Sequence, residues 1–510
     1  MIEKFGIHTG VNLISRFWTM LSAFIFVPIY ISLLGVESYS LITFFVTMQI
    51  ILSLLGVGLS KTLRKEFASN DNSEEENNRK FKLLKSIELI YFFILLIILG
   101  ISFFSSNYIA ERWLNIETLD IPVVSTAIKL MGTSIALQLL ANLYIGCLFG
   151  LDFQIRANIY QVIWSAAKNI GVILVLIYIY PNIISFYTWH LFIDVFYIII
   201  IRRYVIKHLR KNSVIKWRIN DLVILKTIWK YSLGLLIISF GFTINTQVDK
   251  MVISNLLSLT ALGAYSTTFI LANITSIIPT AIGNTIFTKF AYLSSVNNVN
   301  EQKKLFLKVN KISSIFIVST MSFTSIFAYE ILIVWTGSYE IANLMKNSAF
   351  FLVFGFSLNS IQLIAYEYLL ANGKTKLNNI QTFVSIPYVL IVTPILVSFY
   401  GLMGASISVF TLMTLSTIVY LFAFNKYFLK EKPVWIINDV FLPLTLALLL
   451  AVLTKAFLNY YSIEPQYTLI IAISMGLITL LILFCIFDFA SMKRLVYWIK
   501  EKRLSNKRVI

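Results

Sequence analysis

Charged residues are scarce in this chain: they make up 13% of its 510 residues, while hydrophobic residues make up 58%. Soluble globular domains carry roughly 25% charged residues, because a surface that faces water has to be polar. The uncharged positions also come in long blocks, and the stretches 41–60 and 380–400 contain no charge at all. About twenty apolar residues in a helix cross the hydrocarbon core of a bilayer. The composition therefore excludes an ordinary soluble domain and predicts an all-α integral membrane protein.

Cysteine is rare as well. Cys147 and Cys485 lie in apolar stretches without a Cys-x-x-Cys spacing, so neither a disulfide framework nor a metal site is expected. The chain has no Gly-x4-Gly-Lys-Ser/Thr sequence, which argues against ATP hydrolysis. No small-x-small cleavage site follows the first apolar stretch, so we expect a membrane span there and not a secretory signal peptide. We expect no metal and no cofactor.

Apolar stretches of suitable length predict about fourteen membrane spans. The loops between them alternate in lysine and arginine content: basic clusters lie on one side, and the loops of the other side hold little beyond Arg112, Lys250 and Lys346. Because basic loops stay in the cytoplasm, both termini are expected there. The net charge of +18 follows from this sidedness and does not indicate nucleic-acid binding. The expected spans lie at 12–34, 38–60, 87–106, 122–150, 157–180, 183–203, 222–248, 259–289, 309–334, 346–371, 379–400, 402–425, 438–459 and 466–487.

Two internal matches indicate a repeat. Leu-Gly followed by Tyr recurs at the outer turns 31–39 and 257–265, with Gly35 and Gly263 separated by 228 residues. A second pair, Asn158 and Asn379, begins two spans on the inner side and is separated by 221 residues. Six spans lie between the copies, so both point the same way, which predicts two six-helix lobes related by a parallel pseudo-two-fold axis, plus two appended helices. The expected domains are a first lobe at 1–218, a second lobe at 219–436, the appended spans at 437–490 and a basic cytoplasmic tail at 491–510. The polar stretch 68–78 is expected to be a disordered linker.

Short motifs along the first twelve expected spans resemble the polysaccharide (Wzx-type) flippases of the MOP superfamily, which are related to the MurJ lipid II flippases and the MATE exporters. The first motifs are Leu-Leu-Gly-Val-Glu-Ser-Tyr at 33–39 and Leu-Leu-Gly-Val-Gly-Leu at 54–59. The others lie at 249–253, 262–265, 334–337, 369–374 and 400–405. Each motif is short, and the indication comes from their order and spacing.

The resemblance implies a flippase that moves undecaprenyl-diphosphate-linked oligosaccharide repeat units, of the O-antigen or capsule type, by alternating access. The movement would run from the inner to the outer leaflet of the bacterial inner membrane. A lipid-linked oligosaccharide and membrane lipids are the implied partners, with polysaccharide polymerase and chain-length machinery as further candidates, and no enzymatic activity is expected. The resemblance also implies a polar cavity between the lobes, and we expect the protein to function as a monomer.

Charges inside the expected spans are the candidate site residues, because inserting one costs roughly 3 kcal/mol. We hypothesise that Arg16, Lys129 and Lys168 together hold the anionic diphosphate by charge-assisted hydrogen bonds. Asp194 and His190 lie at a depth similar to that of Lys168 and are further candidates for the cavity wall. The alternative for Lys168 and Asp194 is a structural ion pair that ties two spans together.

Lys289, Asp249 and Glu367 are secondary candidates. Lys289 is better explained by a side chain that reaches the headgroups, Asp249 by a capping or packing role, and Glu367 by a solvated position or a pair with a nearby lysine. Pro28 in the first span is a candidate hinge, because proline removes one helical hydrogen bond; a static kink is the alternative.

Two other functions remain open. A MATE-like ion-coupled multidrug antiporter would favour carboxylates inside the membrane, whereas Asp194 is the one deep carboxylate set against three cations. A membrane enzyme, such as an oligosaccharide polymerase or a glycosyltransferase, would need a sizeable outer loop, and the expected outer loops are short.

Overall fold

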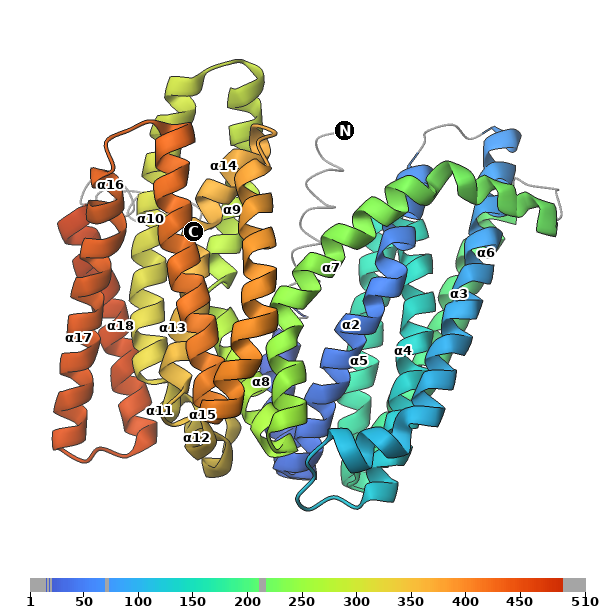
Figure 1. Ribbon diagram of the computed structural model, residues 1–510, viewed down its shortest axis with the longest axis horizontal. Coiled ribbons are helices and arrows are strands. Elements are labelled where there is room, and N and C mark those ends of the chain that lie inside the picture. The colour runs from blue at the N-terminus through green and yellow to red at the C-terminus, as the bar shows by residue number, and fades with distance from the viewer. Residues whose placement is uncertain (1–14, 16–17, 19–20, 69–72, 211–216, 489–510) are drawn as a thin grey trace, which may run out of the picture. The chain divides into compact units, whose positions relative to one another are not determined.

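The computed structural model describes residues 15, 18, 21–68, 73–210 and 217–488. This part of the chain is almost entirely helical (Figure 1), and its one β-bridge joins Asn115 to Ser258. Eleven of its helices are long and apolar enough to cross a membrane, or twelve if the bent pair Leu259–Ile274 and Ile277–Ser295 counts as one span. The prediction of an all-α, multi-pass membrane protein is confirmed.

The chain divides into two compact units, Met1–Gly263 and Ala264–Ile510, and each is described by itself. Unit 1 begins with the helix Leu21–Leu34, which contains Pro28. Arg16 and residues 491–510, the expected tail, lie outside the described residues. The remaining helices of unit 1 are α2 (Val36–Phe67), α3 (Glu74–Tyr108), α4 (Ile121–Gly150), α5 (Gln154–Tyr178), α6 (Ile183–Arg210), α7 (Leu225–Leu256) and the start of α8 (Leu259–Ile274), with short helical turns at Ile109–Trp113 and Ile219–Ile224.

Helix α7 packs along α2 in unit 1. An added Cβ on Gly58 of α2 would lie 2.4 Å from the carbonyl oxygen of Ser232, so the two backbones approach closely because residue 58 is glycine. Close by, the Thr62 and Ser232 hydroxyls are 2.7 Å apart. Contacts thus group α7 with the first unit, although the repeat assigns it to the second lobe. The predicted lobe boundary and lobe symmetry stay predictions.

Glu37, at the start of α2, holds the connection between α3 and α4. Its carboxylate accepts hydrogen bonds from the backbone N–H groups of Glu117, Thr118 and Leu119, at 2.5, 2.7 and 2.9 Å. The same connection reaches the turn before α8, where the Asn115 amide donates to the carbonyl oxygen of Leu257 at 2.9 Å. One glutamate of the first motif therefore organises the turns at this end of unit 1.

At the opposite end of unit 1, the expected linker 68–78 is partly helical. Residues 69–72 lie outside the described part, but α3 begins at Glu74, and the Ser73 hydroxyl accepts a hydrogen bond from the Glu76 N–H at 3.2 Å. A serine at the N-cap satisfies an amide that a helix end leaves free, and the acidic first turn favours the helix dipole. The expectation of disorder was therefore wrong from residue 74 onward.

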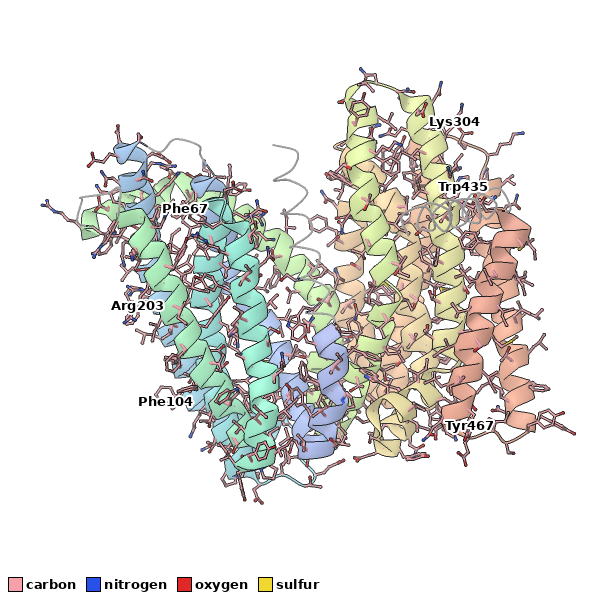
Figure 2. All side chains as sticks on the ribbon, turned by 180° about the vertical axis from the view of Figure 1, so that it is seen from behind. Phe67, Phe104, Arg203, Lys304, Trp435 and Tyr467 are labelled. Atoms are coloured by element: carbon pink, nitrogen blue, oxygen red, sulfur yellow. The ribbon has the colours of Figure 1, made fainter. Side chains whose placement is uncertain are left out.

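Unit 2 contains the rest of α8 and the helices that follow it. Helices α8 and α9 are bent by 46° at their junction, where a single span was expected. Figure 2 shows Lys304 and Tyr467 at opposite ends of this unit, as the predicted alternation of sides requires. The helices are α9 (Ile277–Ser295), α10 (Val299–Ile326), α11 (Ala328–Thr336), α12 (Tyr339–Met345), α13 (Ala349–Asn359), α14 (Leu363–Ala371), α15 (Lys376–Phe424), α16 (Val434–Ile436), α17 (Leu442–Tyr460) and α18 (Pro465–Phe487), with short helical turns at Ser360–Gln362, Asn425–Leu429 and Ile437–Phe441.

Helix α15 is a hairpin of two antiparallel arms. As one straight helix, its 49 residues would extend about 73 Å at 1.5 Å per residue, more than twice the ~30 Å hydrocarbon core. The helix breaks at Gly401, where φ is 57° and ψ is −135°. Hydrogen bonds join residues of one arm to residues of the other that lie a similar number of positions from the break. Thr393 and Ser408 are 2.7 Å apart, and the Tyr420 hydroxyl donates to the Asn378 side-chain oxygen at 2.6 Å. The two arms correspond to the eleventh and twelfth expected spans.

Helices α17 and α18, the two appended spans, pack against α10 and α11. The Ser319 hydroxyl of α10 donates to the carbonyl oxygen of Gly476 in α18 at 3.1 Å. Lys455 of α17 forms an ion pair with Glu330 of α11. The appended spans are thus part of unit 2. The total of fourteen spans stays a prediction, because the first expected span lies partly outside the described residues.

Candidate functional site

Lys168 and Asp194 form a buried ion pair between α5 and α6. The Lys168 Nζ lies 3.0 Å from Asp194 Oδ1 and 3.1 Å from Oδ2. Only 6% of Lys168 and 1% of Asp194 is exposed. Removing one partner of such a pair would leave an uncompensated charge in a medium of low dielectric constant. This geometry is what the structural alternative for the pair predicts, and it ties the fifth and sixth spans together.

Three further side chains donate hydrogen bonds to the Asp194 carboxylate. The Trp164 Nε1 donates to Oδ1 at 2.9 Å, and the Gln138 Nε2 donates to Oδ2 at 3.1 Å. The Ser134 hydroxyl also donates to Oδ2. Both carboxylate oxygens are therefore fully engaged, and a fourth helix joins through Gln49 of α2, which donates to the Gln138 side-chain oxygen. The network links α2, α4, α5 and α6.

Aromatic rings complete the surroundings of Lys168. Its ammonium lies 4.8 Å from the centroid of the Trp164 ring, a cation–π distance. The Trp164 ring stacks on Tyr197 with centroids 4.9 Å apart. We did not predict Trp164, Gln138 or Ser134 from the sequence. The spacing along the helices is the sequence feature that could have identified them. Trp164 precedes Lys168 by four residues, and Ser134 precedes Gln138 by four, so each pair shares a helix face.

His190 lies one turn before Asp194 on α6, but it takes no part in the hydrogen bonds to the carboxylate. Its ring centroid is 4.2 Å from that of Phe186, and 7% of the residue is exposed. Neither ring nitrogen has a hydrogen-bond partner within the part of the chain that the structure describes. His190 is therefore packed against the Phe186 ring, one helical turn from Asp194.

Lys129 lies on α4, five residues before Ser134. Five residues advance the chain by about 7.5 Å and place the two side chains on different faces of the helix. Lys129 is partly exposed and forms no ion pair with any described residue. Among the described residues, no contact joins Lys129 to Lys168 or to the partners of Lys168. Arg16, the third member of the hypothesised site, lies outside the described residues.

The secondary candidates lie apart from this network. Asp249 and Lys250, near the end of α7, form an ion pair of 3.5 Å and are each 6% exposed. In unit 2, Lys289 of α9 is exposed, and Glu367 of α14 packs beside Gly283, where an added Cβ would lie 3.3 Å from its Cγ. Among the described residues, Glu367 forms no ion pair with the nearby lysines.

Pro28 lies inside the helix Leu21–Leu34, two residues before a contact with α5. The Tyr30 hydroxyl donates to the Asn169 side-chain oxygen at 2.9 Å. The Tyr30 ring also meets the edge of Phe186, with centroids 5.2 Å apart. The segment directly after the proline is therefore fixed to the helices that carry the ion pair.

In the described residues, no group of three or more His, Cys, Asp or Glu side chains could hold a metal ion.

No family model matches the chain. A candidate O-antigen transporter of Shigella flexneri is 24% identical over 390 residues, which cover 74% of this chain and 87% of the relative. The solved structure of the lipid II flippase MurJ gives a TM-score of 0.71 at 16% identity, covering 95% of this chain and 99% of that one. A multidrug resistance MATE family transporter of the MOP superfamily gives a TM-score of 0.64 at 13% identity, covering 82% and 95%.

The fold is therefore the one that the MurJ lipid II flippase and this MATE family transporter share. The resemblance to the polysaccharide flippases that the motifs indicate is confirmed as a resemblance, since the sequence relative is a candidate O-antigen transporter.

Proposed function

We propose that this chain is a flippase that moves undecaprenyl-diphosphate-linked oligosaccharide repeat units from the inner to the outer leaflet of the bacterial inner membrane. The similarity to an O-antigen transporter supports the class of substrate. The fold shared with MurJ, a flippase of a lipid, supports a lipid-linked cargo. Both termini are cytoplasmic in this proposal, and transport proceeds by alternating access of two lobes.

The observation that carries the proposal against a drug antiporter is the charge balance in unit 1. Asp194 is the deep carboxylate that a cationic drug or a coupling ion would use, and its two oxygens are already bound by Lys168 and by three neutral donors. Lys129, in contrast, has no carboxylate partner among the described residues. A cation without a partner suits an anionic headgroup, because it can form charge-assisted hydrogen bonds to phosphate oxygens.

The proposed headgroup site therefore contains Arg16 and Lys129, with Lys168 as the member whose charge Asp194 already balances. A polysaccharide polymerase and the chain-length machinery remain the proposed partners on the far side of the membrane. The protein works as a monomer in this proposal.

The test compares two cargoes in one preparation. The purified chain is reconstituted into liposomes, and the transfer between leaflets of a fluorescent undecaprenyl-diphosphate-linked oligosaccharide is measured beside the efflux of a cationic dye. We expect transfer of the lipid-linked sugar well above that of protein-free vesicles, and no dye efflux. Dye efflux driven by an ion gradient, without sugar transfer, would overturn the proposal in favour of the MATE-like antiporter.

A further inference from the structure

Unit 1 contains a cavity of about 220 Å³ in the groove between α2 and α4, with Tyr91 of α3 in its wall. Two glycines among the lining residues shape this groove. An added Cβ on Gly146 of α4 would lie 2.7 Å from the Ser60 hydroxyl of α2, and one on Gly56 would lie 2.8 Å from the Tyr91 hydroxyl. The two hydroxyl groups are satisfied within the wall, since Ser60 donates to the carbonyl oxygen of Asn142 at 2.9 Å and Tyr91 donates to that of Gly56 at 2.7 Å. The cavity therefore has a fixed wall.

Two cations of α2, Lys61 and Arg64, line this cavity. They are three residues apart and so share a face of the helix. Both are exposed, and neither forms an ion pair with any residue in the described ranges. The acidic residue that follows them, Glu66, is bound by Arg79 at 2.8 Å. Two positive charges thus face one small cavity without an acidic partner.

The remaining groups of the cavity fit an oxyanion. The Arg64 guanidinium lies 4.7 Å from the centroid of the Phe149 ring, which is part of the lining and holds the planar group in place. The Asn142 side chain is exposed in the same lining, and its amide forms no hydrogen bond with the described residues. Guanidinium, ammonium and amide groups are all donors, and together they match the oxygens of a phosphate.

The size and the position of the cavity restrict the kind of ligand that it can bind. Pockets for drug-sized molecules measure roughly 300–1,000 Å³, so the volume of this cavity matches a phosphate headgroup better than a whole oligosaccharide. Lys61 directly follows the uncharged stretch 41–60, so both cations stand where the apolar part of the span ends. In a bilayer, lipid phosphates lie just outside the hydrocarbon core, which is where such an apolar stretch is expected to end.

We propose that this cavity binds the phosphate of a membrane lipid through Lys61, Arg64 and Asn142. Two lipids carry this chemistry: a bilayer phospholipid with one phosphate, and the polyprenyl carrier with two. The second source rests on the proposed function and would make the cavity the place where the diphosphate of the cargo is held before it crosses.

The experiment measures lipid binding by the purified full-length chain, using native mass spectrometry and a titration in detergent. The probes are farnesyl diphosphate, phosphatidylglycerol and phosphatidylcholine. Variants Lys61→Gln, Arg64→Gln and the double variant are compared with Lys65→Gln. Lys65 is the matched control, because it is exposed at the same end of α2 but lies over the Tyr231 ring of α7, 4.2 Å from its centroid, and not in the cavity.

We expect the double variant to bind the preferred lipid at least tenfold more weakly, the control to bind as the wild type does, and Lys61→Arg to retain binding. The three substituted residues, Lys61, Arg64 and Lys65, are all exposed, so an unchanged unfolding temperature of each variant shows that folding is intact. Equal losses in the double variant and in Lys65→Gln would overturn the site in favour of diffuse surface charge, as would unchanged binding in the double variant. Preference for farnesyl diphosphate identifies the cargo, and preference for phosphatidylglycerol identifies a bilayer lipid; either supports a phosphate site.

The same variants separate this site from the proposed function. If the wild type fails to transfer the lipid-linked oligosaccharide but the double variant still loses phosphate binding, the flippase proposal fails and the site remains.

Discussion

The ammonium of Lys168 lies within 3.1 Å of both carboxylate oxygens of Asp194, so these two buried charges of the first unit neutralise each other. Breaking a buried pair on one side costs roughly 3–5 kcal/mol, because the remaining charge is buried without a partner. We therefore expect Lys168→Ala to lower the amount of folded protein in the membrane, and Lys168→Ala/Asp194→Ala to recover most of it. Immunoblots of membrane fractions beside glycan export check this.

Lys129→Ala is the comparison for the pair, since Lys129 has no carboxylate partner among the described residues and its removal leaves no buried charge. We expect a normal protein level with reduced export for this variant. If Lys168→Ala/Asp194→Ala lacks export at a normal protein level, Lys168 or Asp194 takes part in transport, and a purely structural role of the pair is refuted.

Replacing the carboxylate of Glu37 should destabilise unit 1. In Glu37→Gln, one acceptor oxygen becomes a donor that faces the N–H groups of residues 117–119, so at least one charge-assisted hydrogen bond is lost, at about 1–3 kcal/mol. We expect a lower unfolding temperature in detergent. Glu111→Gln is the control, since Glu111 is exposed at the same end of the unit; an equal shift in both variants would contradict the capping role.

A methyl group at residue 404 should disturb the α15 hairpin. An added Cβ on Gly404 would lie 1.9 Å from the carbonyl oxygen of Leu396, which is backbone and cannot move aside cheaply. We expect Gly404→Ala to reduce folded protein measurably. Gly100→Ala provides the control, because nothing lies within 4 Å of its added Cβ and alanine favours a helix over glycine by about 1 kcal/mol. Equal behaviour of both variants would mean that the arms can separate.

We predict that Pro28 lets the first span bend during transport. The segment after it is anchored to α5 through Tyr30 and Asn169, so a change of direction would concentrate at the proline. Structures of inward-open and outward-open states should differ in the angle between the two halves of this span. An identical first span in both states would leave only a static kink.

Reporter fusions test the predicted sidedness. Fusions at Lys80, Val214 and Lys507 should report the cytoplasm, and fusions at Asn115 and Glu340 the outside. Asn115 belongs to the end of unit 1 that Glu37 organises, so a cytoplasmic signal there would reverse the orientation of the whole unit.

The helices were largely predictable because each is an uncharged block, and hydropathy identifies such blocks without knowledge of their neighbours. Gln138 and Trp164 were not found as partners of Asp194, because these hydrogen bonds cross three helices and depend on how the helices pack. The start of α3 is predictable from local sequence, because Ser73 and the three glutamates after it form a helix-capping sequence, whereas the polarity of residues 68–78 alone indicates a linker. The packing of α7 against α2 depends on the close approach at Gly58, which is visible only in three dimensions.

The α15 hairpin also has a consequence for how the protein is made. No charged residue lies between Lys376 and Lys426, and the turn at Gly401 offers no basic loop to retain on either side of the membrane. Lysines flank the hairpin at both ends, and both ends lie on the same predicted side. We therefore predict that the two arms enter the bilayer during synthesis as a single unit, and that the lysines at both ends together set their orientation.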